Sequence, residues 1–318
     1  MSLILDPRGH EFGAFSARVT HPDTLATLCR AADTSLAEVE RHTRMALAES
    51  AQTLAVLRGL EVPVGARILE VGAGLGVTSN FLASQGASVI ALEPGGGGFE
   101  AHARLSVSLA AVLQTGLELR NDPVESLTPE RDGRFDLIYS NNVLEHVADP
   151  IDALRVLQAL VDSRGVSVHS CPNYVVPFEP HFGIPLVPLR PASTARLLPQ
   201  RVRGSGLWQS LNFVTSADVR TTASHLGCEV IFRPGVLAAS LRRLDDDAEF
   251  RRRHPALGRL GSLLTRFRIP DAAARLPATW STPMDFALLG PERSADTLNA
   301  WRRALLGRGD PEWPPLTG

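Results

Sequence analysis

Short apolar runs recur along the chain, and most of them are separated by stretches with helical periodicity. The first run, Ile68 to Val71, has the density of apolar side chains that strands buried on both faces require. A glycine-rich turn, a helical stretch and a second apolar run at 88–92 follow it. Further strand-like runs lie at 117–119, 135–140, 165–170, 229–232 and 284–289. This alternation predicts an α/β fold, a doubly wound, mostly parallel seven-stranded sheet with right-handed crossovers.

The segment ahead of the first strand is mainly helical in pattern. Residues 1–20 mix glycine, proline and polar residues without a period, so we expect an irregular arm there, followed by a short helix at 21–32. Ser35 and Glu38 form a capping box that begins a longer helix ending near Leu57. The loose apolar stripe of this helix fits a packing or dimerisation surface.

Two later segments interrupt the alternation. Residues 171–211 contain seven prolines and no clean period, and a loop of that length in a compact domain is either functional or disordered. Residues 236–275 look helical and rich in arginine. Their interleaved acidic residues favour a solvated surface, whereas the arginines could instead cap a pocket and bind a carboxylate, phosphate or sugar-nucleotide group. Prolines 311, 314 and 315 predict a loose C-terminal end.

The turn after the first strand has a specific spacing, in which Glu70 is followed by glycines at 72, 74 and 76. Strand, glycine turn, helix, strand and the acid Glu93 make up a nucleotide-binding βαβ unit, where missing side chains let a ligand lie against the backbone. A dinucleotide fingerprint requires a glycine where Val77 stands. The spacing therefore disfavours a nicotinamide dehydrogenase.

The motif EVGAGLG at 70–76 and the segment DLIYSNNVLEHVADP at 136–150 together resemble those of the class I S-adenosylmethionine-dependent methyltransferases of the small-molecule type. The resemblance covers roughly residues 67–232 and the last strand. It implies S-adenosyl-L-methionine as cofactor, with Glu93 on the ribose hydroxyls and Asp122 on the adenine amino group. It also implies cofactor contacts, mainly at the methionine end, from Glu70, Gly72, Ala73, Gly74, Gly76, Pro94, Asn141 and Asn142.

Methyl transfer requires alignment of a nucleophile with the methyl group, and a base only where the acceptor carries a proton that must leave. His181, in the segment after the fifth strand, has an ordinary pKa suited to that task, and Glu179 is close enough in the chain to orient it. The resemblance places His146 near the adenosine or the substrate. Both histidines also have a purely structural interpretation, as ordinary loop or packing residues.

Substrate contacts are expected from two places. Asn173 and Tyr174 could position a polar substrate, and Arg242 and Arg243 could recognise an anionic one. The alternative for the arginines is the solvated helical surface described above.

The sequence argues against a metal. Glu145, His146, Glu179 and His181 could in principle assemble a site, but their spacing matches no recognised ligand pattern. We therefore expect no metal.

Composition narrows the range of partners. All 32 basic residues are arginine, and the net charge of −2 disfavours a general nucleic-acid binder. The three cysteines lie far apart without a CxxC pair, which predicts free thiols in a reducing compartment. Without a signal peptide or an apolar run of about 18 residues, the chain reads as cytoplasmic, with no membrane partner.

These observations divide the chain into four parts. We expect an N-terminal arm with helices that cover the cofactor mouth (1–60), a Rossmann-like cofactor-binding core containing the substrate loop (61–234), an arginine-rich cap (235–283), and the last core strand with a tail (284–318). The expected function is biosynthetic methylation of a small polar, anionic or sugar-like acceptor, at a hydroxyl with His181 as base. N- or C-methylation and a non-catalytic cofactor-binding subunit are the alternatives, and a homodimer is compatible with each.

Overall fold

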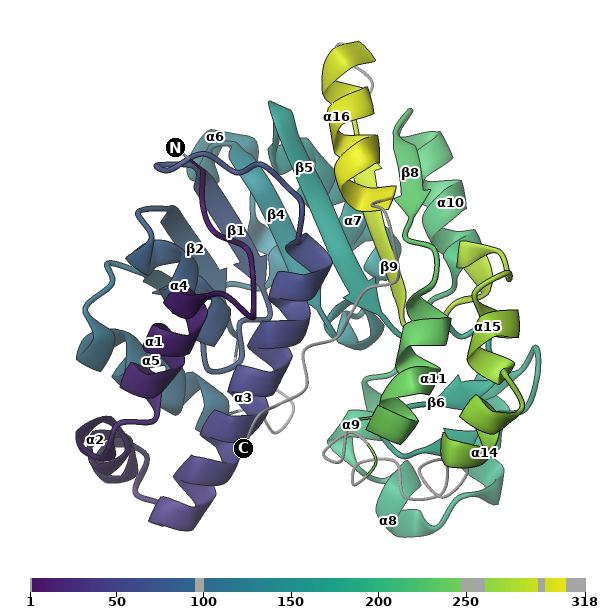
Figure 1. The fold of residues 1–318 in the computed structure, drawn as a ribbon, viewed down its shortest axis with the longest axis horizontal. Helices are drawn as coiled ribbons and strands as arrows, with labels where there is room; N and C mark the ends of the chain where they lie inside the picture. Colours follow the sequence, from purple (N-terminus) through teal and green to yellow (C-terminus); the bar gives the residue numbers. More distant parts are fainter. Residues whose placement is uncertain (1, 95–99, 247–250, 252–260, 291–294, 307–318) are drawn as a thin grey trace.

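The computed structural model describes residues 2–94, 100–246, 251, 261–290 and 295–306 (Figure 1). The glycines at 95–98, the arginines at 252, 253 and 259 of the arginine-rich insert, and the prolines at 311, 314 and 315 lie outside these residues. Within the described residues, none of the helices has the length and apolar character needed to cross a bilayer.

One seven-stranded sheet organises the molecule, in the order β3-β2-β1-β4-β5-β9-β8. All strands are parallel except β9, which runs antiparallel to both of its neighbours. The fold class predicted from the sequence is therefore confirmed, and the last two strands form an antiparallel pair. The strands are β1 (Arg67–Val71), β2 (Ser88–Leu92), β3 (Glu118–Arg120), β4 (Phe135–Asn141), β5 (Val161–Cys171), β8 (Glu229–Phe232) and β9 (Met284–Leu289).

Helices cover both faces of the sheet (Figure 1). Neighbouring residues of β1 show this directly, because Ile68 belongs to an apolar cluster shared with α1 to α4, and Leu69 belongs to another shared with α7. Burial on both faces explains why these strands are continuous apolar runs. Asp149 caps α7, since its side chain accepts hydrogen bonds from the backbone N–H groups of Ile151 and Asp152 in the first turn. The helices that follow strands are α4 (Val77–Ser84), α5 (Glu100–Leu113), α6 (Pro129–Asp132), α7 (Pro150–Leu160) and α10 (Ser216–His225).

The N-terminal segment consists of three helices, α1 (His10–Val19), α2 (Pro22–Ala32) and α3 (Leu36–Leu57). Ser35 caps α3 as predicted. The irregular arm expected at 1–20 is wrong over half its length, since α1 is a regular helix. Its buried residues Phe12 and Phe15 pack against Phe81 of α4, with ring centroids 5.1 and 5.4 Å apart. Packing against the core stabilises this short helix despite its two nearby glycines.

The proline-rich segment 171–211 is ordered. Its elements are β6 (Phe178–Glu179), β7 (Ile184–Pro185), a 3₁₀ stretch (Pro191–Leu197), α8 (Gln200–Arg203) and α9 (Gly206–Gln209). β6 and β7 form a hairpin separate from the main sheet. The segment has a small apolar cluster of its own, made of Tyr174, Leu186, Trp208 and Leu211.

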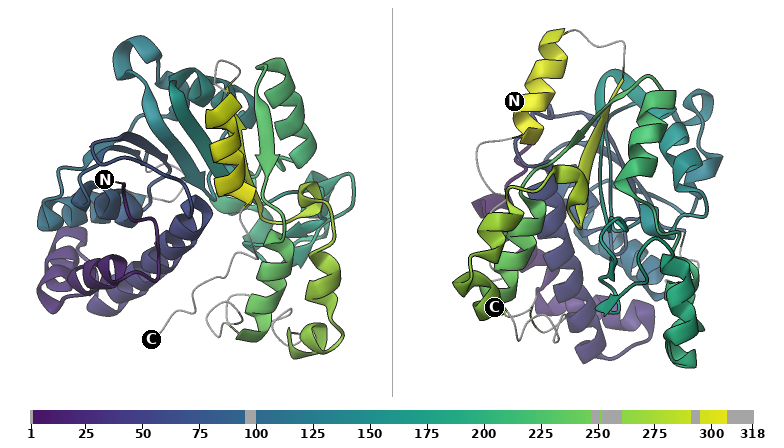
Figure 2. Two further views of the ribbon diagram at one scale, coloured as in Figure 1. Left: turned by 45° about the horizontal axis from the view of Figure 1, so that its top comes forward. Right: turned by 90° about the vertical axis from the view of Figure 1, so that its right-hand side faces the viewer.

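The insert between β8 and β9 is helical, as predicted, with α11 (Val236–Asp246), α14 (Gly261–Arg266) and α15 (Ile269–Ala273). In the left view of Figure 2 this group lies on the opposite side of the molecule from α1 and α2, the purple helices. After β9 the chain forms α16 (Ala295–Leu306), in the part of the chain where we expected a C-terminal tail. Leu305 of α16 is buried against the sheet, so tertiary packing decides this element.

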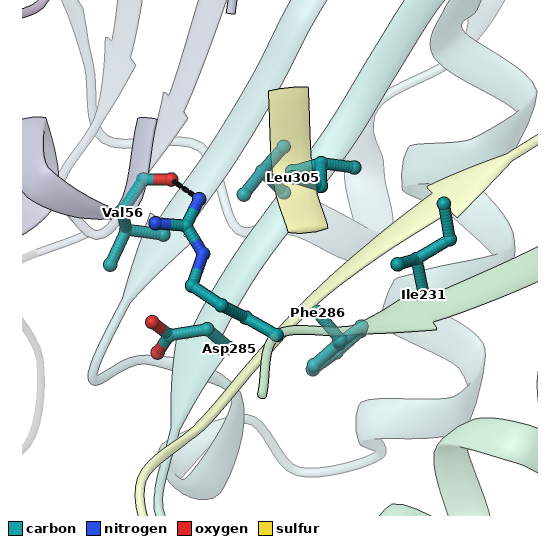
Figure 3. Close-up of a pocket in the computed structure, with 7 residues that line it drawn as sticks. Val56, Ile231, Asp285, Phe286 and Leu305 are labelled. Atoms are coloured by element: carbon teal, nitrogen blue, oxygen red, sulfur yellow. Dashed lines mark hydrogen bonds between the residues drawn. The ribbon is translucent and has the colours of Figure 1, made fainter. Parts of the chain in front are cut away.

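A shallow recess, filled by its own side chains, lies where α3 meets the sheet (Figure 3). Arg233 fills its polar side and donates hydrogen bonds to the carbonyl oxygens of Ala55, at 3.1 Å, and Val56, at 2.5 Å. These are carbonyls of the last turn of α3, where positive charge is stabilising. Asp285 also lines the recess and accepts a hydrogen bond from Ser170. The recess is thus a joint between α3 and the sheet.

Candidate active site

The glycine turn between β1 and α4 adopts a backbone that only glycine takes without strain. Gly72, Gly74 and Gly76 have φ angles of 72°, 55° and 70°. A Cβ at position 72 would lie 2.3 Å from Cγ2 of Val143, whereas a Cβ at position 74 would meet nothing within 4 Å. One glycine therefore allows close packing against the segment after β4, and the other leaves an open face along the backbone where a ligand can lie.

Glu93 lies beside this turn, at the carboxyl end of β2. Its side chain is nearly buried, and Oε2 accepts a hydrogen bond of 2.7 Å from the backbone N–H of Gly74. The carbonyl oxygen of Leu92 accepts from the N–H groups of Gly72 and Ala73, both at 2.9 Å. These bonds hold the turn and the acid in one rigid unit. Pro94, the next residue, is exposed.

Glu70 lies beneath the turn and points toward α4. Burial raises the pKa of this carboxyl group to about 7, although hydrogen bonds from Ser79 lower it in part. The hydroxyl of Ser79 donates to Glu70 Oε2. The structure thus gives Glu70 a supporting position at the start of α4, while its contact with the cofactor stays a prediction.

Three further residues predicted to bind the cofactor occupy the same edge of the sheet. Asp122 follows β3 and forms an ion pair of 3.3 Å with Arg131. Asn141 ends β4 and donates to Thr53 of α3 at 3.1 Å. Asn142 is exposed and has a φ of 55°. The carboxyl ends of parallel strands meet at one edge of the sheet, which is where open α/β sheets bind their ligands.

Four polar side chains from two distant segments meet just after β4. They belong to Glu145 and His146 in the 3₁₀ turn Leu144–His146, and to Glu179 and His181 in the β6–β7 hairpin. Nε2 of His181 lies 3.7 Å from Oε1 of Glu145, and Nε2 of His146 lies 3.9 Å from the same oxygen. We call these four residues the Glu–His cluster. It adjoins the glycine turn because Val143, which packs on Gly72, is two residues before Glu145.

Each histidine of the cluster is held through its Nδ1 atom. Nδ1 of His181 lies 2.6 Å from Oε1 of Glu179, a carboxylate that can only accept, so His181 carries its proton there. Nδ1 of His146 lies 2.8 Å from Oγ of Ser210, whose hydroxyl proton goes to the carbonyl of Leu207 at 2.9 Å. His146 is therefore also the donor at Nδ1. In the neutral form of each ring, the lone pair is therefore on Nε2, the atom nearer to Glu145.

Burial and charge shift the pKa values of the cluster in opposite directions. Burial raises the pKa of Glu145 to about 7, and the charge of His181 only partly offsets this. Burial and the charge of His181 lower the pKa of His146 to about 4. Burial alone would lower the pKa of His181, but the hydrogen bond to Glu179 and the nearby carboxylates outweigh it and raise the pKa. The same hydrogen bond and the charge of His181 outweigh burial at Glu179 and lower its pKa.

The residues that position the cluster include some that the sequence did not single out. The side-chain amide of Asn212 donates to the carbonyl oxygens of Leu144, at 2.6 Å, and Val147, at 2.8 Å. Its backbone N–H donates to the carbonyl oxygen of Glu145 at 3.0 Å. Asn212 thus fixes the turn that carries Glu145, and no local pattern around position 212 could have indicated this.

The two residues predicted to contact the substrate, Asn173 and Tyr174, have different surroundings. Asn173 is fully buried, and its amide bonds to four backbone groups hold the loop to the segments around Ser216 and Thr279. The hydroxyl of Tyr174 donates to Oε1 of Glu179 at 3.4 Å, so this residue belongs to the cluster's surroundings. Substrate binding by Asn173 and Tyr174 stays a prediction, and the buried setting of Asn173 favours its structural interpretation.

The two arginines of α11 contact different partners. Arg242 forms an ion pair of 3.3 Å with Asp271 of α15. Arg243 is buried, and both of its Nη atoms lie 3.1 Å from the Gln52 side-chain oxygen once that amide is turned to face them. Because Gln52 is on α3, Arg243 connects the insert to the N-terminal helices. Anion recognition by these arginines also stays a prediction.

Comparison with known proteins agrees with this arrangement. The sequence profile of a methyltransferase domain matches residues 40–231, which extend from within α3 to within β8. This chain is a member of the methyltransferase family. An uncharacterised protein of Mycobacterium tuberculosis is 34% identical over 241 residues, which cover 71% of this chain and 80% of that protein.

Similarity to named methyltransferases is more limited. A ubiquinone biosynthesis O-methyltransferase of Azotobacter vinelandii is 36% identical over 103 residues, covering 32% of this chain and 42% of that enzyme. Among solved structures, phosphoethanolamine N-methyltransferase 2 of Haemonchus contortus has a TM-score of 0.45 and 14% identity, over 76% of this chain and 52% of that one. The YcgJ protein of Bacillus subtilis has a TM-score of 0.43 and 14% identity, over 76% and 97%.

The cofactor of this methyltransferase is S-adenosyl-L-methionine. The observed edge fits that group, since the open backbone at Gly74 and the acid at Glu93 lie side by side. The backbone at Gly74 would lie along the methionine portion, and the Glu93 carboxylate would accept from the ribose hydroxyls. When bound, the cofactor supplies a methyl group already activated on a sulfonium.

The Glu–His cluster bears on the expectation that the protein binds no metal. The argument against a metal was that Glu145, His146 and His181 show no recognised spacing in the sequence. In the folded methyltransferase one donor atom from each of these residues lies within 4.8 Å of the others. Their proximity arises from the return of the β6–β7 hairpin to the end of β4, a long-range contact that sequence spacing does not report.

Proposed function

We propose that this methyltransferase transfers a methyl group to a hydroxyl oxygen of a small polar molecule. The observation that carries the proposal is the Glu–His cluster, a set of proton acceptors at the carboxyl edge of the sheet beside the glycine turn. A hydroxyl must lose its proton as its oxygen takes the methyl group, whereas many other acceptors need no base. The cluster provides an acceptor for that proton at the correct edge.

Within the cluster, His181 is the candidate proton acceptor. Its side chain is 23% exposed, compared with 16% for His146 and 0% for Glu145, so it is the member that a substrate reaches most easily. Glu179 fixes its orientation through Nδ1, which leaves Nε2 as the acceptor. This division of roles, in which a buried carboxylate orients an imidazole, is a common basis for general-base catalysis.

A small acceptor agrees with the surroundings of the cluster. The proline-rich segment forms a compact unit with its own apolar cluster, and α11 contacts α3 through Arg243. The sequence similarity to an enzyme named as an O-methyltransferase also supports the proposal, although it extends over only 103 residues. The arginines of the insert would suit an anionic group on the acceptor.

The first test is cofactor binding, measured by calorimetry with S-adenosylhomocysteine. Glu93→Ala should weaken binding by about 10- to 100-fold, since a hydrogen bond to a charged group contributes about 1.5–3 kcal/mol. The matched control is Glu61→Ala, which removes an exposed carboxylate in the loop before β1. Equal affinity of the two variants would remove Glu93 from the cofactor site.

The second test is methyl transfer to a panel of phenols, hydroxy acids and sugar phosphates, with formation of the methyl ether as readout. His181→Asn should lower kcat by about 100-fold or more while leaving the affinity for S-adenosylhomocysteine unchanged. His225→Asn, an exposed histidine of α10, is the control. Transfer to an amine or carbon acceptor instead would identify N- or C-methylation, and cofactor binding without turnover on any acceptor would favour a non-catalytic subunit.

A further inference from the structure

We propose that Glu145, His146 and His181 bind one divalent transition-metal cation. Their donor atoms, one carboxylate oxygen and two imidazole nitrogens, lie within 4.8 Å of one another. The two distances from Glu145 Oε1, 3.7 Å to His181 and 3.9 Å to His146, resemble the spacing of ligands around a shared ion. For metal–ligand bonds of about 2.0–2.1 Å, tetrahedral ligands are about 3.3 Å apart, so each histidine needs to approach Glu145 by only about half an ångström.

The hydrogen bonds of the two histidines prepare them for a metal. In each ring Nδ1 is engaged, by Glu179 in one case and Ser210 in the other, and each Nε2 faces Glu145. Metal-binding histidines characteristically donate their second ring nitrogen to a carboxylate or other acceptor, which fixes the tautomer and the ring orientation. Here Glu179 and Ser210 fix the tautomer and orientation of the two rings without a bound ion.

Glu145 provides an independent observation. Its side chain is 0% exposed, and within the described residues neither of its carboxylate oxygens has a hydrogen-bond partner. Burial of a carboxyl group without partners costs free energy, and buried charges are normally paired or coordinate metals. A cation between Glu145 and the two Nε2 atoms would satisfy this residue, which the protein atoms around it leave unsatisfied.

The donor set indicates the class of ion. Two imidazoles and one carboxylate favour Zn²⁺, Mn²⁺, Co²⁺ or Fe²⁺, whereas Mg²⁺ and Ca²⁺ prefer oxygen ligands only. Three protein ligands leave a coordination position open, as in catalytic rather than structural sites. The partial exposure of His181 and His146 gives that position access to solvent or to a small substrate.

The catalytic consequence rests on the proposed O-methylation, while the binding of the ion does not. A hydroxyl on the open position would lose its proton more readily, because a bound cation lowers the pKa of a coordinated oxygen. The proton would pass to solvent water, and the resulting alkoxide or phenoxide oxygen would form the new bond to the methyl group as the sulfonium–methyl bond breaks. Nε2 of His181 would then serve as a ligand and not as the proton acceptor.

The test uses the full chain, treated with a chelator and transferred to metal-free buffer. Titration with ZnCl₂ by calorimetry, and with CoCl₂ by visible absorption, should show one equivalent bound. The variants Glu145→Gln, His146→Gln and His181→Gln should each weaken binding by about 100-fold, and the controls Glu61→Gln and His225→Gln should leave it unchanged. A Cys29→Ser/Cys228→Ser background should bind the ion equally, which excludes the two partly exposed thiols.

Two further measurements check that the variants are folded and identify the atoms that bind the metal. S-adenosylhomocysteine binding by each cluster variant shows that it is folded, and X-ray absorption of the zinc-loaded wild type, which needs no variant, should show nitrogen and oxygen neighbours with imidazole scattering. Binding that survives all three substitutions, sulfur neighbours, or an absence of binding would overturn the proposal. Because the titration involves neither cofactor nor acceptor, such a failure leaves the proposed O-methylation untouched, and failed methyl transfer leaves the metal result untouched.

Discussion

The side chain of Val143 lies directly against Gly72, so that a Cβ added to the glycine would come within 2.3 Å of Cγ2 of the valine. This contact joins the cofactor turn after β1 to the segment after β4 that carries Glu145 and His146. The close approach and the φ of 72° are separate reasons for glycine at this position.

Gly72→Ala should therefore destabilise the protein by about 3 kcal/mol, the sum of left-handed backbone strain and overpacking. Chemical unfolding in urea measures this, and calorimetry with S-adenosylhomocysteine should show weaker binding. Gly74→Ala is the matched comparison, because its Cβ would meet nothing within 4 Å and only the backbone strain applies. Val143→Ala should rescue part of the loss in a double variant with Gly72→Ala. Equal effects of the two alanine substitutions would contradict the contact.

Arg233 should be important for stability and not for chemistry. Its part-buried guanidinium donates to the last turn of α3, and it lines the same recess as Asp285. Arg233→Ala should lower the free energy of unfolding by about 3 kcal/mol, since it leaves two carbonyl groups without their donor and removes the positive charge near the buried Asp285 carboxylate. Arg302→Ala breaks an exposed ion pair with Glu229 and should have little effect. A small loss for both would show that the joint is not needed.

Glu70 should make stability depend on pH. Its pKa in the folded protein is raised to about 7 by burial, above the value of about 4.3 in an unfolded chain, so the folded state holds the proton more tightly. The stabilisation from this proton is fully present below about pH 4 and is lost as the pH rises through about 7, a total of about 4 kcal/mol. Comparison of the wild type with Glu70→Gln by urea unfolding at a series of pH values isolates this contribution. Parallel pH profiles for the two proteins would rule it out.

Glu179 should act as a positioning residue. Glu179→Gln removes the carboxylate that holds Nδ1–H of His181, while the side chain keeps its shape. We expect kcat to fall by about 10- to 100-fold with unchanged affinity for S-adenosylhomocysteine, and the affinity for Zn²⁺ to fall by a similar factor. Glu179→Asp, which keeps the charge, should recover part of both. If the glutamine variant matched the wild type in kcat and in Zn²⁺ affinity, His181 would not depend on this contact.

The sequence predicted the parts of the fold that rest on local pattern. Runs such as Ile68–Val71 and Ser88–Leu92 are buried on both faces of the sheet, and burial of that kind leaves a plain apolar signature. The helices α1 and α16 were missed because each depends on packing that no local pattern announces. Phe12 and Phe15 are stabilised by Phe81, some 70 residues away in the chain.

The cofactor side of the candidate site could be predicted from the sequence more fully than the Glu–His cluster. The glycines and Glu93 stand in a fixed order along one short stretch, so a motif identifies them. The Glu–His cluster combines residues from 145–146 and 179–181, and its geometry depends on the hairpin and on Asn212. His181 with Glu179 could be nominated from the sequence, since they are neighbours in the chain. The burial of Glu145 and its position between two imidazoles became visible only in the folded structure.

The small apolar cluster of the proline-rich segment, Tyr174, Leu186, Trp208 and Leu211, is separate from the apolar layers on the sheet. A substitution within it can shift the hairpin that carries His181 while leaving the packing of the βαβ unit intact. Divergence can therefore remodel the acceptor side of such a protein without endangering the half that binds the methyl donor. In evolution, the βαβ unit can thus preserve the fold while the proline-rich segment changes to accept new acceptors.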